Sequence, residues 1–140
     1  MFRILIVDDD EDIRDEIADF LETVGYDCTQ APDVRRARSC LKTGEFQLIL
    51  SDLNMPGESG LDLLRHASSN YPDTAVILMS GYQDPRMADI ALKMGAHAYL
   101  MKPFRIADLL AHMASALRCP PVGYRGPGDG LAQPGACWVG

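Results

Sequence analysis

The 140-residue sequence lacks several features that would assign it to a specialised class of protein. It has only four cysteines, with no Cys-x-x-Cys pair and no histidine at the spacing of a zinc site, so we expect reduced thiols. Its apolar runs reach four or five residues, far short of the roughly 20 that span a membrane. It has no lysine- or arginine-rich run, and its net charge of −7 does not attract nucleic acid. The scattered histidines, His66, His97 and His112, predict structural or surface roles.

The remaining composition is typical of a single globular domain. Apolar residues make up 47% of the chain and charged residues 24%. The length is close to the usual size of one domain with one hydrophobic core. The acidic run "DDDED" (Asp8 to Asp12) follows the first apolar stretch and is incompatible with a signal peptide. We therefore expect a cytoplasmic protein that binds neither a membrane nor, by itself, nucleic acid.

Short apolar runs alternate along the chain with patterns of helical period. The runs predict strands at Arg3–Val7, Tyr26–Ala31, Phe46–Ser51, Thr74–Ser80 and Ala96–Met101. A helical stripe follows each run, which gives five β/α units. Such alternation predicts an α/β fold of the doubly wound, flavodoxin-like type, with a five-stranded parallel sheet and strand order 2-1-3-4-5. The second strand is the most polar, so we expect it at a sheet edge.

Capping residues and glycines mark where the predicted helices begin and end. The expected starts are Asp10, Asp33, a capping box of Ser59 with Asp62, and Asp84 before Pro85; the expected ends are Gly25, Gly44 and Gly95. The composition changes after Arg118. Residues 119–140 are rich in glycine and proline and have no periodicity. We therefore expect a domain over residues 1–118 and a linker or disordered tail over 119–140.

Polar residues follow four of the predicted strands. These are Asp8 and Asp9 after the first, Asp52 at the end of the third, Ser80 at the end of the fourth and Lys102 after the fifth. The carboxyl ends of parallel strands share one edge of a sheet, so these side chains should meet in one cleft. Each pair of carboxylates about 5 Å apart would repel by roughly 3 kcal/mol at an effective dielectric constant near 20. A divalent cation such as Mg²⁺ would relieve this repulsion.

This set of groups suits phosphoryl transfer. A hard cation and an ammonium group neutralise phosphoryl oxygens, a hydroxyl binds them, and an aspartate can carry the phosphoryl group. The residues therefore predict that Asp52 is a nucleophile and that Asn54, two positions later, assists the metal site through its backbone or side chain. Any one of these residues alone would be an ordinary cap or turn residue. Their occurrence together at four strand ends favours a functional site.

At these positions the sequence resembles the receiver domain of two-component response regulators, over residues 1 to about 118. The resemblance lies in "ILIVDDD", "LILSDLNMPGESGLDLL", "VILMSGY" and "AYLMKPF". It implies the following roles: Asp52 as phosphoacceptor; Asp8, Asp9, Asp52 and the carbonyl of Asn54 as metal ligands; Ser80 and Lys102 as phosphate-binding residues; Tyr99 as the aromatic switch residue. It also implies a cis peptide bond between Lys102 and Pro103.

The resemblance implies a function in phosphorelay signalling. Asp52 would accept a phosphoryl group from a sensor histidine kinase or phosphotransfer protein, with Mg²⁺ as cofactor and Mn²⁺ as a possible substitute. The chain would be a signalling phosphoacceptor rather than an enzyme, with at most self-catalysed phosphotransfer and autodephosphorylation. The conformational change would control an output domain or partner. Dimerisation through the fourth helix, fifth strand and fifth helix is a further expectation.

Two alternatives use similar residues. A haloacid-dehalogenase-like phosphatase also has an aspartate nucleophile after an apolar strand. A resemblance to that family, however, implies an Asp-x-Asp motif near the start of the chain and an acidic pair late in it. Here the pair precedes Asp52, and Asn54 stands where a phosphatase needs a general acid. The second alternative is a receiver-like module that binds partners without phosphorylation. The complete set of acids, serine and lysine disfavours it.

Overall fold

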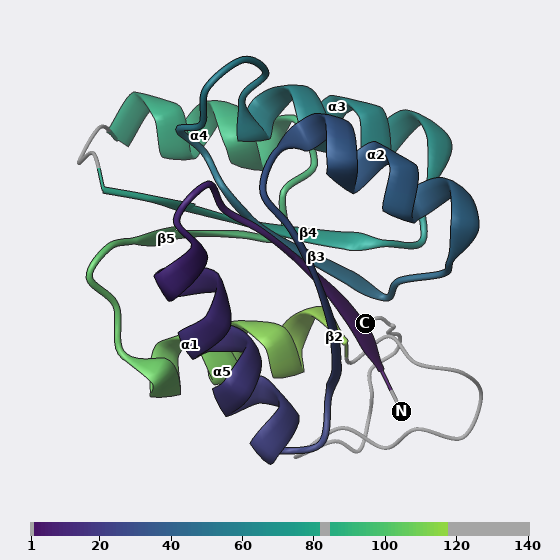
Figure 1. The fold of residues 1–140 in the computed structure, drawn as a ribbon. Coiled ribbons are helices and arrows are strands. Elements are labelled where there is room, and N and C mark those ends of the chain that lie inside the picture. Colours follow the sequence, from purple (N-terminus) through teal and green to yellow (C-terminus); the bar gives the residue numbers. More distant parts are fainter. Residues whose placement is uncertain (1, 82–84, 118–140) are drawn as a thin grey trace, which may run out of the picture. The chain divides into compact units, whose positions relative to one another are not determined.

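A computed structural model describes residues 2–81 and 85–117 of the chain (Figure 1). The chain divides into two units, Met1–Pro103 and Phe104–Gly140. The first unit contains a five-stranded sheet, and the second contributes helix α5 (Ile106–Ala116). The predicted cap at Asp84 and the predicted tail at 119–140 lie outside the described residues.

The sheet is parallel throughout, with strand order β2-β1-β3-β4-β5. Its strands are β1 (Arg3–Val7), β2 (Asp27–Ala31), β3 (Leu48–Asp52), β4 (Ala75–Ser80) and β5 (Ala98–Met101). The helices of the same unit are α1 (Glu11–Thr23), α2 (Val34–Thr43), α3 (Gly60–Asn70) and α4 (Pro85–Lys93). The predicted doubly wound fold and strand order are confirmed. The polar strand β2 lies at an edge, as predicted.

Helices cover both faces of the sheet in the first unit. Helices α2, α3 and α4 lie on one side and α1 lies on the other (Figure 1). Leu5 and Val7 of β1 belong to a cluster of buried residues with apolar side chains of α2, α3 and α4. Because successive strand residues point to opposite faces, Ile4 and Ile6 point toward the face that α1 covers. The central strands are thus buried on both faces, which explains their continuous apolar sequence.

The predicted capping residues begin the helices as expected. The Asp10 carboxylate accepts hydrogen bonds from the first turn of α1, and the Asp33 carboxylate accepts one from Arg36. Ser59 and Asp62 form the reciprocal capping box of α3. Gly25 and Gly95 follow α1 and α4 with φ of 105° and 109°, a region that side chains disfavour. Gly44 also ends its helix, but in an extended conformation.

The predicted strands differ from the observed ones mainly at their starts. Strand β3 begins at Leu48, two residues after the predicted start at Phe46. Phe46 is buried, but the guanidinium group of Arg3 covers it, 4.7 Å from the ring centroid. The apolar pattern therefore marked burial rather than sheet pairing. At the other end, Asp52 is the last residue of β3, at the strand end where it was predicted.

The described residues include five helices and two of the four cysteines. Within 2–81 and 85–117, no helix combines the length and apolar character needed to cross a membrane. Cys28 and Cys40 are free thiols. Burial raises the pKa of Cys28 to about 12, and the nearby acids Glu22 and Asp27 contribute, so this thiol is not a reactive nucleophile.

His66 of α3 gives the fold a predicted pH dependence. Burial, with Arg38 and Lys42 of α2 nearby, lowers its pKa from the ordinary 6.5, against the opposing effect of Glu58. The unfolded chain therefore binds a proton more readily than the folded chain as the pH falls below about 6.5. We expect the contribution of neutral His66 to the free energy of unfolding to be fully present above that pH. It should be lost as the pH falls through the pKa of the folded state.

The measurement is urea unfolding of the wild type and His66→Gln between about pH 8 and pH 5. The substitution should reduce the loss of stability toward low pH. An identical pH dependence in both proteins would show that protonation of His66 is not coupled to folding.

Candidate functional site

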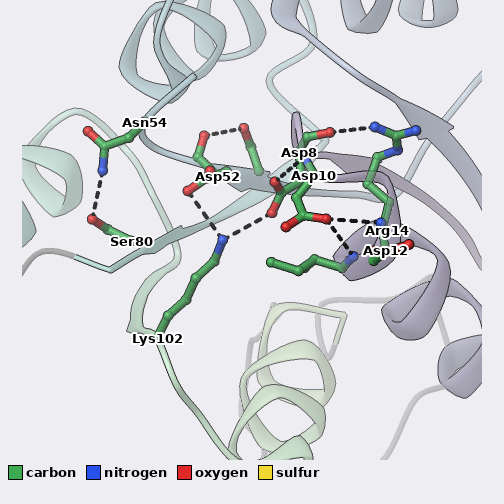
Figure 2. A network of polar contacts seen from close by, with 10 residues as sticks. Asp8, Asp10, Asp12, Arg14, Asp52, Asn54, Ser80 and Lys102 are labelled. Atoms are coloured by element: carbon green, nitrogen blue, oxygen red, sulfur yellow. Dashed lines mark hydrogen bonds and ion pairs between the residues drawn. The ribbon is translucent and has the colours of Figure 1, made fainter. Parts of the chain in front are cut away.

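The predicted polar residues meet at the carboxyl edge of the sheet (Figure 2). Strands β1 and β3 are neighbours, and Val7 pairs with Ser51. Asp8 follows Val7 and Asp52 follows Ser51, so these two acids lie at the same level of the sheet. Lys102 follows β5 and reaches both acids: its Nζ lies 3.0 Å from Asp8 Oδ2 and 3.6 Å from Asp52 Oδ1.

Three carboxylates form the centre of this site. Oxygen atoms of Asp8, Asp9 and Asp52 all lie within 4.8 Å of one another. Asp8 is 1% exposed and Asp52 is 7% exposed, whereas Asp9 is exposed to solvent. Lys102 compensates only part of this negative charge. The site therefore carries a concentrated negative charge that is partly buried.

The environment of Asp52 disfavours its ionised form. Its pKa is raised mainly by burial, with further contributions from the charges of Asp8 and Asp9. Lys102 and a hydrogen bond from the backbone N–H of Asn54 act in the opposite direction. A cation bound by these oxygens would remove the repulsion. Carboxylate and carbonyl oxygens are the ligands that Mg²⁺ takes in proteins, so the residues fit this metal.

Asn54 and Ser80 form a second pair beside the acids. Asn54 Nδ2 donates a hydrogen bond to Ser80 Oγ at 3.0 Å (Figure 2). Ser80 is completely buried at the end of β4. The sequence left open whether the backbone or the side chain of Asn54 assists a metal. In this structure Ser80 holds the side chain of Asn54 through its amide nitrogen, which favours the backbone carbonyl as the metal ligand.

Tyr99 lies on β5, next to the strand that ends in Ser80. It pairs with Leu78, and Leu78 and Ser80 point to the same face of β4. Its ring packs against the apolar cluster, and its hydroxyl is buried with no hydrogen-bond partner among the described residues. Tyr99 is therefore on the same side of the sheet as Ser80. The peptide bond between Lys102 and Pro103 is cis, as the resemblance implied.

Gly60 supports the site from α3 and is not among the residues predicted from the sequence. A Cβ at this position would lie 2.6 Å from the carbonyl oxygen of Asp52 and 3.0 Å from Leu53 Cα. The backbone of α3 thus contacts the backbone of the predicted nucleophile, and only glycine allows this approach. The available signal was its position: Gly60 begins a helix instead of ending one.

We expect Gly60→Ala to disturb both stability and the site. Overpacking of this kind costs about 1–3 kcal/mol in the free energy of unfolding, and relief requires movement of the Asp52 backbone. Mg²⁺ affinity should therefore fall together with stability, as measured by titration and by urea unfolding. Gly95→Ala is the control, because its backbone φ of 109° should destabilise the fold away from the acids. Wild-type Mg²⁺ affinity in Gly60→Ala would contradict this prediction.

Comparison with known proteins identifies the family to which this fold belongs. Residues 4–114 match the family described as the response regulator receiver domain. The chain belongs to this family. It is a receiver domain of two-component signalling, as the sequence motifs predicted. The match gives no support to the phosphatase alternative.

Individual relatives agree with this assignment. The receiver domain is 37% identical to the response regulator protein PilR of Pseudomonas aeruginosa over 83% of this chain and 26% of the relative. It is 35% identical to the phosphate regulon regulator PhoB of the same organism, over 92% of this chain and 55% of the relative. The chain thus spans between a quarter and just over half of these curated relatives.

Solved structures show the same fold. A CheY-like receiver domain protein from Methanospirillum hungatei superposes with a TM-score of 0.79 at 34% identity, covering 84% of this chain and 94% of that one. The response regulator TrrA of Thermotoga maritima, solved with Mg²⁺ and a beryllium fluoride, has a TM-score of 0.76 at 30% identity, over 84% and 100% of the two chains.

Proposed function

We propose that Asp52 is the phosphoacceptor of this receiver domain. It ends a buried strand among two other acids and a lysine, and burial raises its pKa. In the proposed step, a carboxylate oxygen of Asp52 attacks the phosphorus of the donor in line. A new P–O bond forms as the bond to the leaving group breaks, and the leaving group retains that electron pair. The product is an aspartyl phosphate.

The proposed metal ligands are Asp8, Asp9, Asp52 and the backbone carbonyl of Asn54. The support is the convergence of three carboxylates within 4.8 Å and the engagement of the Asn54 side chain elsewhere. When bound, Mg²⁺ would neutralise phosphoryl oxygens and the carboxylates around Asp52. Mn²⁺, another cation that takes oxygen ligands, is the proposed substitute.

Lys102, Ser80 and Tyr99 are the proposed phosphate-binding and switch residues. Lys102 already lies within 4 Å of Asp52, so its ammonium group can pair with an oxygen of a phosphoryl group there. The hydroxyl of Ser80 would leave Asn54 to bind another phosphoryl oxygen. Tyr99, whose buried hydroxyl has no partner among the described residues, would report that change on its face of the sheet.

The proposed donor is a sensor histidine kinase or phosphotransfer protein, because receiver domains take phosphoryl groups from histidine kinases. The proposed dimer uses α4, β5 and α5. Helix α4 exposes Ile90 and Leu92, at 43% and 49%. A related receiver domain, that of NtrC4, is described as a beryllofluoride-activated dimer and has a TM-score of 0.79 with this chain at 34% identity. Residues 119–140 would link the domain to an output domain or partner.

The test is the intact mass of the protein after incubation with acetyl phosphate and Mg²⁺. We expect a stable gain of one phosphoryl group, which a metal chelator prevents. Continuous hydrolysis of a phosphomonoester without a stable adduct would instead indicate a phosphatase. No uptake by the folded protein at any Mg²⁺ concentration would indicate a module that acts without phosphorylation.

A further inference from the structure

Arg14 of α1 connects the acidic end of β1 to β2, on the edge of the site. Its Nη1 donates a hydrogen bond to the backbone carbonyl of Asp8 at 2.7 Å, and its Nε donates to Gln30 Oε1 at 3.2 Å. Figure 2 shows the guanidinium group beside the carbonyl of Asp8. We propose that Arg14 is a positioning residue, which fixes the β1–α1 turn so that Asp9 faces Asp52. This inference rests on the proposed metal site.

The contacts of Asp8 show what Arg14 contributes. The N–H of Asp8 donates to the carbonyl of Ala31 at 3.2 Å, and its Oδ1 and Oδ2 accept from Asp10 N and Lys102 Nζ at 2.9 and 3.0 Å. Its carbonyl accepts from Arg14. Every polar group of Asp8 is thus held, and the hydrogen bond from Arg14 fixes the peptide plane that leads to the next residue.

Asp9 needs this support because its own side chain is free to move. It is exposed, and within residues 2–81 and 85–117 its carboxylate has no hydrogen bond or ion pair. Its direction therefore depends on the backbone of the turn. Arginine suits the task because its rigid planar group offers donors in two directions, which reach Asp8 and Gln30 together.

Because Arg14 is charged, a purely electrostatic role and a positioning role predict opposite changes in Mg²⁺ affinity when it is replaced. A cation held at the backbone carbonyl of Asp8 would oppose Mg²⁺ binding by simple electrostatics, so its removal would by itself strengthen Mg²⁺ binding. A positioning role predicts the opposite, because the carboxylates lose their alignment. Loss of a group that orients metal ligands weakens affinity by about tenfold or more. The sign of the change separates the two.

The experiment is a Mg²⁺ titration of the full chain, followed by amide shifts, for the wild type and three variants. Arg14→Gln should raise the dissociation constant about tenfold. Arg14→Lys keeps the charge but loses the planar guanidinium group, so it should also bind Mg²⁺ more weakly than the wild type, though less weakly than Arg14→Gln. Arg3→Gln removes the same charge at the opposite end of β1, where the side chain stacks on Phe46, and should leave the dissociation constant unchanged.

A metal-free spectrum distinguishes failure of this proposal from failure of the metal site. In the presence of a chelator, Arg14→Gln should shift the amide signals of Asp9 and Gln30, and Arg3→Gln should leave them in place. If the wild type binds no Mg²⁺, the proposed metal site is wrong, and these shifts alone decide whether Arg14 holds the turn.

Unchanged or stronger Mg²⁺ binding in folded Arg14→Gln would overturn the proposal. So would unchanged metal-free signals of Asp9. If Arg14→Gln does not fold, Gln30→Met provides the same test from the other end of the hydrogen bond. It should weaken Mg²⁺ binding in the same direction, and wild-type affinity in that variant would equally overturn the proposal.

Discussion

Asp52→Asn is expected to abolish phosphoryl uptake from acetyl phosphate. The amide retains the shape of the side chain but lacks the nucleophilic oxygen. The same substitution should raise the free energy of unfolding in metal-free buffer, because it removes a charge that burial, Asp8 and Asp9 all disfavour. Intact mass and urea unfolding in chelator measure these two effects. Together they would show a residue whose ionised form costs stability in return for reactivity.

Asp10→Asn is the matched control. Asp10 belongs to the same acidic run, but its carboxylate caps α1, and asparagine is an equally good cap. This variant should take up the phosphoryl group like the wild type, with unchanged stability. Undiminished uptake in Asp52→Asn would contradict the assignment of the phosphoacceptor. A loss of stability in that variant would contradict the view that the charge of Asp52 is only partly compensated.

Lys102→Ala should have the second largest effect on stability, and the size of this effect should depend on the metal. Lys102 is the cation that pairs with the buried Asp8 and with Asp52. Removal of one partner from a buried pair costs about 3–5 kcal/mol, and the 23% exposure of Lys102 favours the lower end. In chelator we therefore expect a loss of about 3 kcal/mol in the free energy of unfolding. Mg²⁺ should restore more stability to this variant than to the wild type.

The control for Lys102→Ala is Lys93→Ala. Lys93 also forms an ion pair, with Asp89 on α4, but it is 76% exposed, so its removal should have a small effect that Mg²⁺ does not change. Phosphoryl uptake should be slower in Lys102→Ala and normal in Lys93→Ala. If Mg²⁺ stabilised Lys102→Ala no more than the wild type, Lys102 would not share the metal's carboxylates.

The fold could be predicted from the sequence because its signals are local. Helix caps such as Asp10 and Asp33 act within one turn, and the continuous apolar sequence of β4 records burial on both faces. The strand ends could be placed only approximately. Burial of Phe46 beneath Arg3 imitates a strand residue, because an apolar pattern does not distinguish packing from hydrogen bonding.

The site could be predicted in part for the same reason. Asp8, Asp52 and Lys102 each follow an apolar run, so the parallel topology was enough to bring them together. The contacts that hold them could not be predicted. In the sequence, Arg14 does not differ from an ordinary surface arginine of a helix. The close approach of Gly60 to the Asp52 carbonyl depends on the path of the intervening loop.

The most direct test of the account locates the phosphoryl group on the chain. The protein is incubated with acetyl phosphate and Mg²⁺, then treated with borohydride, which reduces an aspartyl phosphate to homoserine. Peptide sequencing by mass spectrometry then identifies the changed residue. The account predicts homoserine at position 52 alone, and none when Mg²⁺ is chelated. Homoserine at Asp8 or Asp9, or a phosphoryl group that survives on another type of side chain, would contradict it.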